Sequence, residues 1–160
     1  MTGLTTWAPN SHALILHLPI GLLATATVVD VITTLRRDPS TTVLLAHGLY
    51  MVGTVTLLAT YLTGRHAAAE VFTPGLALPV VAEHWERALW CTWYFGLVTA
   101  GRIFLALYVP RPQRAITTTL CVVSLIGFGL LAATAELGGR LVYEHGVGVA
   151  APISRLPWRP

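Results

Sequence analysis

The sequence has little charge and no lysine. Of its 160 residues only 11% are charged, whereas 54% are hydrophobic, and all ten basic residues are arginines. A soluble domain of this length needs more charge to cover its surface, and without that charge it would expose large apolar patches. The net charge of +3 is modest, and the arginines do not form the dense basic cluster of a nucleic-acid-binding protein. The composition therefore indicates an integral membrane protein.

Motifs of soluble enzyme chemistry are missing as well. The only two cysteines, Cys91 and Cys121, lie in separate hydrophobic runs without CxxC or metal-type spacing. We expect them to pack at different depths, without a disulfide. The sequence has no nucleophile elbow, no HExxH and no P-loop. These absences argue against a soluble hydrolase or a metal-dependent enzyme.

Four apolar segments are each close to the roughly 20 residues that cross a bilayer. They predict a single all-α integral membrane domain, a bundle of four transmembrane helices over about residues 12–34, 41–63, 80–108 and 115–137. Because glycine often ends a helix, we expect the second helix to stop at Gly64 and the fourth at Gly138 and Gly139. Residues 138–160 would then form a tail.

Arginine is concentrated in two short alternate loops. Arg36 and Arg37 follow the first segment, and Arg111 and Arg114 separate the third from the fourth. Short loops rich in arginine remain in the cytoplasm, so both termini are expected outside, in a multi-pass protein of the bacterial plasma membrane. The tail would also lie outside.

Ionisable residues inside the spans are costly unless they are paired or face the bundle interior. Asp30 follows His12 by eighteen residues, and Arg102 follows His84 by the same number. Eighteen residues make five turns, so each pair shares one helical face about 27 Å apart. Asp30, Arg102 and His47 should meet in an inner polar layer. This layer is either a buried ion-pair network or a set of side chains that reach the cytoplasmic interface.

An outer layer holds the histidines His12, His17, His84 and His145. A four-helix bundle is a natural haem scaffold, because facing helices can supply ligands to one iron. His12 and His17 differ by about 140° around the helix, so they are unsuited to one iron. His12 and His84 share depth and phase and are the favoured axial pair. Interfacial or hydrogen-bonding roles for these histidines remain the alternative.

Pro19 lies inside the first predicted helix. Its ring nitrogen cannot donate the helical hydrogen bond to the carbonyl of Ile15. We therefore expect the helix to bend near His17.

Two sequence motifs resemble those of the bacterial membrane family catalogued as domain of unknown function 2231. Residues 12–19, HALILHLP, resemble an HPxxxHFP-type start, with Ala13 and Leu18 in place of proline and phenylalanine. Residues 137–149, LGGRLVYEHGVGV, are similar to the signature GGxLVYxHGVGV. Three further positions also fit, namely Asp30, Thr63-Gly64 and His84. The resemblance implies a four-helix membrane domain that relatives can carry fused to Rieske-type or cytochrome-c-type domains.

Histidine pattern and resemblance together predict a b-type cytochrome-like subunit of a larger redox or respiratory complex. It would bind one or two haem b groups near the outer face and exchange electrons with a quinone or an outer partner. The expected site residues are His12 and His84 as axial ligands, His17 and His145 as alternates, and Arg87 and Arg140 beside the propionates. The rival hypotheses are a cofactor-free accessory subunit and a small transporter or proton-conducting element.

The predicted topology can be tested with cysteine labels in intact cells. Labels in the loops 36–40 and 110–114 should be shielded from a membrane-impermeant reagent, whereas labels near Ala67 and Ile153 should react. The arginine bias of the two short loops is the physical reason. Reaction of the loop labels in sealed cells would refute the arrangement with both ends outside.

Overall fold

The computed structural model describes residues 11–36, 40–109 and 113–149, and these residues contain helices but no strand. The elements are α1 (Ser11–Ile15), α2 (His17–Leu35), α3 (Ser40–Glu70), the 3-10 helix η1 (Gly75–Ala77), α4 (Leu78–Tyr108) and α5 (Arg114–Tyr143). Taking α1 with α2, and η1 with α4, four helical segments are long and apolar enough to cross a membrane. The predicted all-α bundle of four membrane-spanning helices is confirmed.

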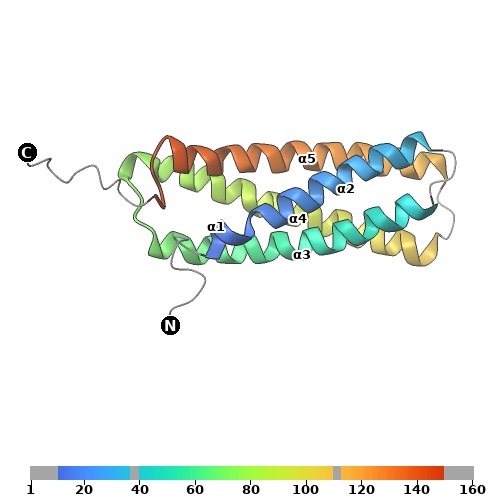
Figure 1. The fold of residues 1–160 in the computed structure, drawn as a ribbon, viewed down its shortest axis with the longest axis horizontal. Coiled ribbons are helices and arrows are strands. Elements are labelled where there is room, and N and C mark those ends of the chain that lie inside the picture. The colour runs from blue at the N-terminus through green and yellow to red at the C-terminus, as the bar shows by residue number, and fades with distance from the viewer. Residues whose placement is uncertain (1–10, 37–39, 110–112, 150–160) are drawn as a thin grey trace, which may run out of the picture.

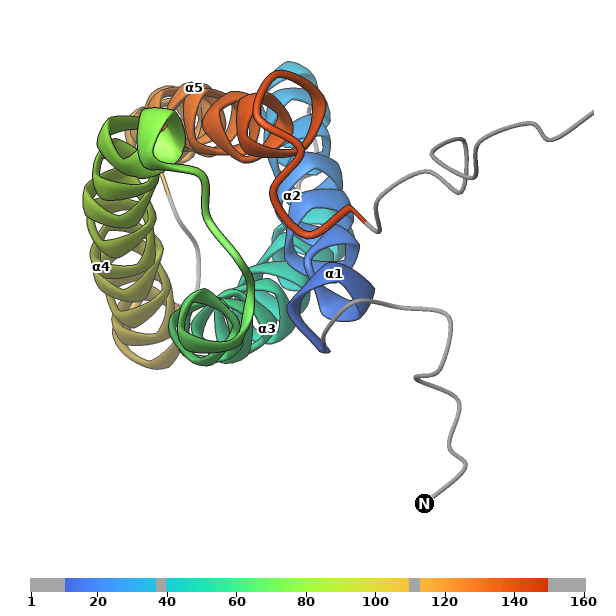
Figure 2. The same ribbon diagram turned by 90° about the vertical axis from the view of Figure 1, so that its left-hand side faces the viewer.

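The long helices run side by side and form a ring in the order α2, α3, α4, α5 (Figures 1 and 2). The helices α2 and α4 therefore face each other across the bundle, as do α3 and α5. One end of the bundle, called here the terminal end, holds α1, the connection from α3 to α4 and the end of α5 (Figure 1). The opposite end, where α2 and α4 finish, is called the loop end.

Apolar side chains fill the middle of the bundle. The buried core consists of Leu23, Ala26, Tyr50, Leu57, Cys91, Phe95 and Leu131. Large apolar residues also cover the exterior, for example Val55, Trp93 and Leu97, which are 69%, 63% and 70% exposed. Such a surface suits contact with lipid rather than water. Both cysteines are buried and free, as expected.

The first transmembrane segment is interrupted where the sequence predicts a bend. Helix α1 ends at Ile15 and α2 begins at His17, with Leu16 in a turn between them. Pro19 is fully buried in the first turn of α2, where a missing N–H costs least.

Two helices are longer than predicted. The expected stops at Gly64 and at Gly138 and Gly139 are wrong, because α3 continues to Glu70 and α5 to Tyr143. A glycine within a helix costs about 1 kcal/mol relative to alanine, and packing can offset this cost. At Gly64 and at Gly138 a histidine ring of a neighbouring helix occupies the space that a larger side chain would need, as described below.

Helix α5 ends instead in a turn that folds back over the terminal end. Gly146 and Gly148 have positive φ angles of +64° and +74°, which favour glycine. The N–H of Val147 donates to the carbonyl of Leu141, and a Cβ at Gly148 would lie 3.8 Å from Val71 at the end of α3. At this end of the bundle the turn runs on the side of α2 (Figure 2). The rest of the predicted tail, 150–160, and the arginines Arg37 and Arg111 lie outside the described residues.

Candidate functional site

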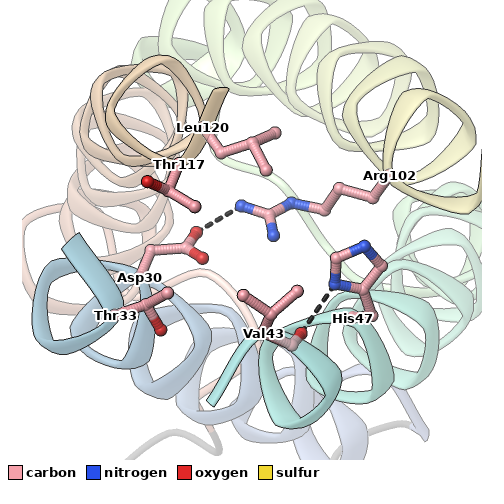
Figure 3. Close-up of a pocket in the computed structure, with 7 residues that line it drawn as sticks. All are labelled: Asp30, Thr33, Val43, His47, Arg102, Thr117 and Leu120. Carbon is pink, nitrogen blue, oxygen red and sulfur yellow. Dashed lines mark hydrogen bonds and ion pairs between the residues drawn. The ribbon is translucent and has the colours of Figure 1, made fainter. Parts of the chain in front are cut away.

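A buried ion pair joins two diagonally opposed helices near the loop end (Figure 3). Asp30 of α2 and Arg102 of α4 are 4% and 1% exposed, and their side chains form a salt bridge and hydrogen bond. Ser124 of α5 contacts both side chains. Its hydroxyl accepts a bond of 3.0 Å from Arg102 and donates to Asp30 or to its own helix at the Leu120 carbonyl. Of the two readings of the inner layer, the structure shows the buried network.

Helix α3 contributes an aromatic ring to the same network. The guanidinium carbon of Arg102 lies 3.9 Å from the ring centroid of Tyr50, which is completely buried on α3. A cation over an aromatic face is attracted by the ring quadrupole, and this attraction is strongest where water is excluded. The hydroxyl of Tyr50 is 3.5 Å from that of Thr27. All four long helices thus hold one charged pair.

His47 lies beside this network. Its Nδ1 is 2.6 Å from the carbonyl of Val43, one turn back on α3. A cavity of about 10 Å³ separates His47 from the ion pair, which is close to the space that one water molecule needs. The cavity is lined by Asp30, Thr33, Val43, His47, Arg102, Thr117 and Leu120 (Figure 3). The three residues of the predicted inner layer therefore do lie together. The Nε of Arg102 is buried there without a hydrogen-bond partner among the described residues.

Two histidines at the terminal end make matching contacts with neighbouring helices. The Nδ1 of His12 is 3.0 Å from the carbonyl of Thr60 on α3, and the Nδ1 of His84 is 3.1 Å from the carbonyl of Thr134 on α5. A carbonyl only accepts hydrogen bonds, so each Nδ1 carries the hydrogen, and in the neutral imidazole Nε2 then keeps its lone pair. The bonds that the two rings form with described residues are both made by Nδ1.

Each of these histidine rings also packs against a glycine. A Cβ at Gly64 would lie 3.0 Å from Cε1 of His12, and one at Gly138 would lie 3.3 Å from Cε1 of His84. The two histidines belong to the first and third spans, which lie diagonally across the ring of helices. The expected match of His12 and His84 in depth and phase stays a prediction.

The other predicted site residues have different surroundings. His17 is exposed on the outside of α2. His145 follows α5, is 21% exposed, and its Nε2 is buried at 4.0 Å from Glu144. Arg87 and Arg140 form exposed i,i+4 salt bridges with Glu83 and Glu144, respectively.

Between the two layers the bundle interior is mainly apolar. Thr54 of α3 and Thr99 of α4 are joined by a bond of 2.7 Å, next to the core residues Tyr50 and Phe95. The described residues contain no group of three or more His, Cys, Asp or Glu that could hold a metal ion. The terminal end offers two imidazole donors, which is the donor set of a bis-histidine iron.

Several residues that take part in the two polar layers were not predicted from the sequence. Tyr50 and Ser124 contact the ion pair, and Thr60 and Thr134 offer backbone carbonyls to the histidines. Hydroxyl residues are common in apolar helices, where they bond to the carbonyl four residues back, so their type carries little signal. One signal was available, since a glycine follows Thr60 and Thr134 four residues later in both helices.

The four apolar helices define a multi-pass integral membrane protein, and its bundle interior contains a buried charged pair. The chain belongs to the family described as predicted membrane protein, domain of unknown function 2231, whose model matches residues 8–151. The resemblance found in the sequence is thereby confirmed. No curated protein and no solved structure matches the chain.

The ion pair can be tested with a double-mutant cycle in detergent. Asp30→Asn and Arg102→Met should each lower the free energy of unfolding by about 3 kcal/mol, because each leaves one charge buried without its partner. The double variant should lose less than the sum of the two. Glu83→Gln breaks an exposed pair and serves as control, with an expected loss below about 0.5 kcal/mol. Additive losses at Asp30 and Arg102 would contradict the coupling.

Proposed function

We propose that the protein is a b-type cytochrome-like electron-transfer subunit of a larger redox or respiratory complex. It would hold a haem at the terminal end, with His12 and His84 as axial ligands. The observation that supports this proposal is the matched pair of imidazoles, each fixed through Nδ1 to a carbonyl of a neighbouring helix. In metal-ligating histidines, a hydrogen bond from the ring nitrogen that does not bind the metal likewise fixes the tautomer and the orientation of the ring.

The chain's own contribution would be ligation, orientation and exclusion of water. The carbonyls of Thr60 and Thr134 hold the hydrogen on Nδ1 and direct the lone pair of Nε2 away from it. Haem bound there would supply one-electron chemistry, and the surrounding apolar helices would set its dielectric environment. His145, with a buried Nε2, is a better alternate donor than the exposed His17.

Arg87 and Arg140 are proposed to neutralise haem propionates at the mouth of the bundle. Both are now paired with glutamates on the exposed surface. Exposed salt bridges contribute little stability, so exchanging a glutamate for a propionate costs little. A quinone or an outer-face redox partner would exchange electrons with the haem.

A cofactor-free accessory subunit is the second candidate. It is favoured by the same two bonds, because a histidine that donates to a carbonyl of the next helix also ties helices together without any ligand. The predicted transporter has less support, since an apolar core separates the two polar layers in the described interior.

The haem proposal is tested by the reduced-minus-oxidised spectrum and pyridine haemochrome of protein isolated gently with its partners. His12→Ala and His84→Ala should each abolish the b-type spectrum. His47→Ala should leave it intact, because His47 precedes Gly64 by 17 residues, or about 25 Å along α3, whereas an iron–nitrogen bond is about 2 Å.

Two further variants identify the ligands. His17→Ala should retain the spectrum, and its loss there with retention in His12→Ala would assign the ligand to His17. Equal thermal unfolding of all variants in detergent is the control for folding. A wild-type complex without a Soret band would refute the cytochrome assignment and favour the accessory subunit.

A further inference from the structure

The two halves of the bundle place corresponding residues at a constant offset. His12 and His84 are 72 residues apart, and so are Asp30 and Arg102. Thr60 and Thr134 are 74 residues apart, and so are Gly64 and Gly138. The first offset relates α1 and α2 to α4, and the second relates α3 to α5.

Burial follows the same two offsets. The buried residues of α4 are Cys91, Phe95, Thr99 and Arg102, and each lies 72 positions after a buried residue of α2. On α3 and α5, five buried positions correspond at the offset of 74, namely 50, 53, 57, 60 and 67 with 124, 127, 131, 134 and 141. Periodic burial alone would arise in any four-helix bundle. The side-chain contacts provide the more specific comparison.

The histidine contacts are equivalent in the two halves. In each half the imidazole of the first helix bonds through Nδ1 to a threonine carbonyl of the second helix. In each half the ring also lies over the glycine that follows this threonine by four residues. Two independent contacts therefore repeat with the same atoms.

Two further contacts repeat at deeper levels. A Cβ at Gly53 would meet Leu23 and Leu22, and one at Gly127 would meet the equivalent residues Phe95 and Tyr94. Asp30 contacts Ser124 on α5, while Arg102 contacts Tyr50 on α3. Arg102 is the equivalent of Asp30, and Tyr50 is the equivalent of Ser124. The contact of Arg102 with Tyr50 is therefore the equivalent of the contact of Asp30 with Ser124.

We infer that residues 11–70 and 78–143 are two copies of one helical hairpin, related by a two-fold axis along the bundle, and that one ligand binds on this axis between His12 and His84. The nature of the ligand, a haem iron that the two equivalent imidazoles would hold, rests on the proposed function. The repeat itself does not. Gly64 and Gly138 then have the same task, which is to leave room for the imidazole and so position its Nε2.

The equivalence of the two glycines is tested by alanine at each. Gly64→Ala and Gly138→Ala should weaken haem retention by similar factors, about five- to tenfold each, as expected when an imidazole is pushed off its rotamer. Both should also shift the low-spin electron paramagnetic resonance signal, which a loss of general stability would not. Gly48→Ala on α3 and Gly129→Ala on α5 are matched controls, because nothing lies within 4 Å of a Cβ at either position.

The repeat is tested without any ligand by exchanging the charged cluster between the halves. A fourfold variant, Asp30→Arg, Arg102→Asp, Tyr50→Ser and Ser124→Tyr, regenerates each contact at the equivalent position. It should fold in detergent with a thermal midpoint close to that of wild type. Asp30→Arg alone and Arg102→Asp alone should lose most folded protein, since each buries two like charges.

The two experiments separate the possible failures. An effect at only one of the two glycines, with haem bound, would refute the equivalent site. A fourfold variant no more stable than the single variants would refute the repeat. Absence of haem from the wild-type complex would overturn the ligand and the proposed function together, while the exchange experiment would still decide the repeat.

Discussion

A carboxylate and a guanidinium inside an apolar bundle must be paired, and this requirement fixes the register of all four long helices. An unpaired charge at such a depth would cost several kcal/mol. Asp30 and Arg102 meet only if α2 and α4 stand at one relative height, and Ser124 and Tyr50 add the same constraint for α5 and α3. Apolar side chains pack against lipid about as well as against another helix, so apolar packing favours no single arrangement of the helices. Polar contacts of this kind therefore select one arrangement among many. The level of the histidine layer follows from it, through the eighteen residues that separate each histidine from its charged partner.

The sequence predicts the coarse architecture well because the bilayer limits the choices. Four apolar runs of the right length can hardly be anything but four helices, and equal spacing from His12 to Asp30 and from His84 to Arg102 places two layers at common depths. The same reasoning failed at Gly64 and Gly138, since glycine was taken as a helix stop. In the structure the missing side chain makes room for an imidazole from the neighbouring helix. A pattern within one segment cannot reveal a requirement that arises between segments.

The network around the ion pair was also beyond reach of the sequence. Nothing in the type of Ser124 or Tyr50 separates it from the other hydroxyl residues in these helices, most of which satisfy themselves on their own backbone. Their position relative to Arg102 depends on the crossing of α3 and α5 with α4, which follows from the packing of all four helices. Whether Asp30 and Arg102 were buried or reached the interface could not be decided from their distance to the helix ends. The cation–aromatic contact with Tyr50 favours burial, because it stabilises the guanidinium where water is absent.

The two ends of the bundle use the repeated hairpin in opposite ways. At the terminal end the equivalent residues are identical, and both imidazoles bond through Nδ1 to a threonine carbonyl of the neighbouring helix. At the loop end the equivalent residues carry opposite charges, which allows an ion pair across that axis. Two identical hairpins could provide the first end but not the second, because equivalent positions would then hold two carboxylates or two guanidinium groups that repel each other. Joining both hairpins in one chain removes this conflict, since each copy can diverge at the loop end while the histidine end stays the same. The ion pair also excludes assembly of like halves, α2 against a second α2, and thereby favours the pairing of α2 with α4.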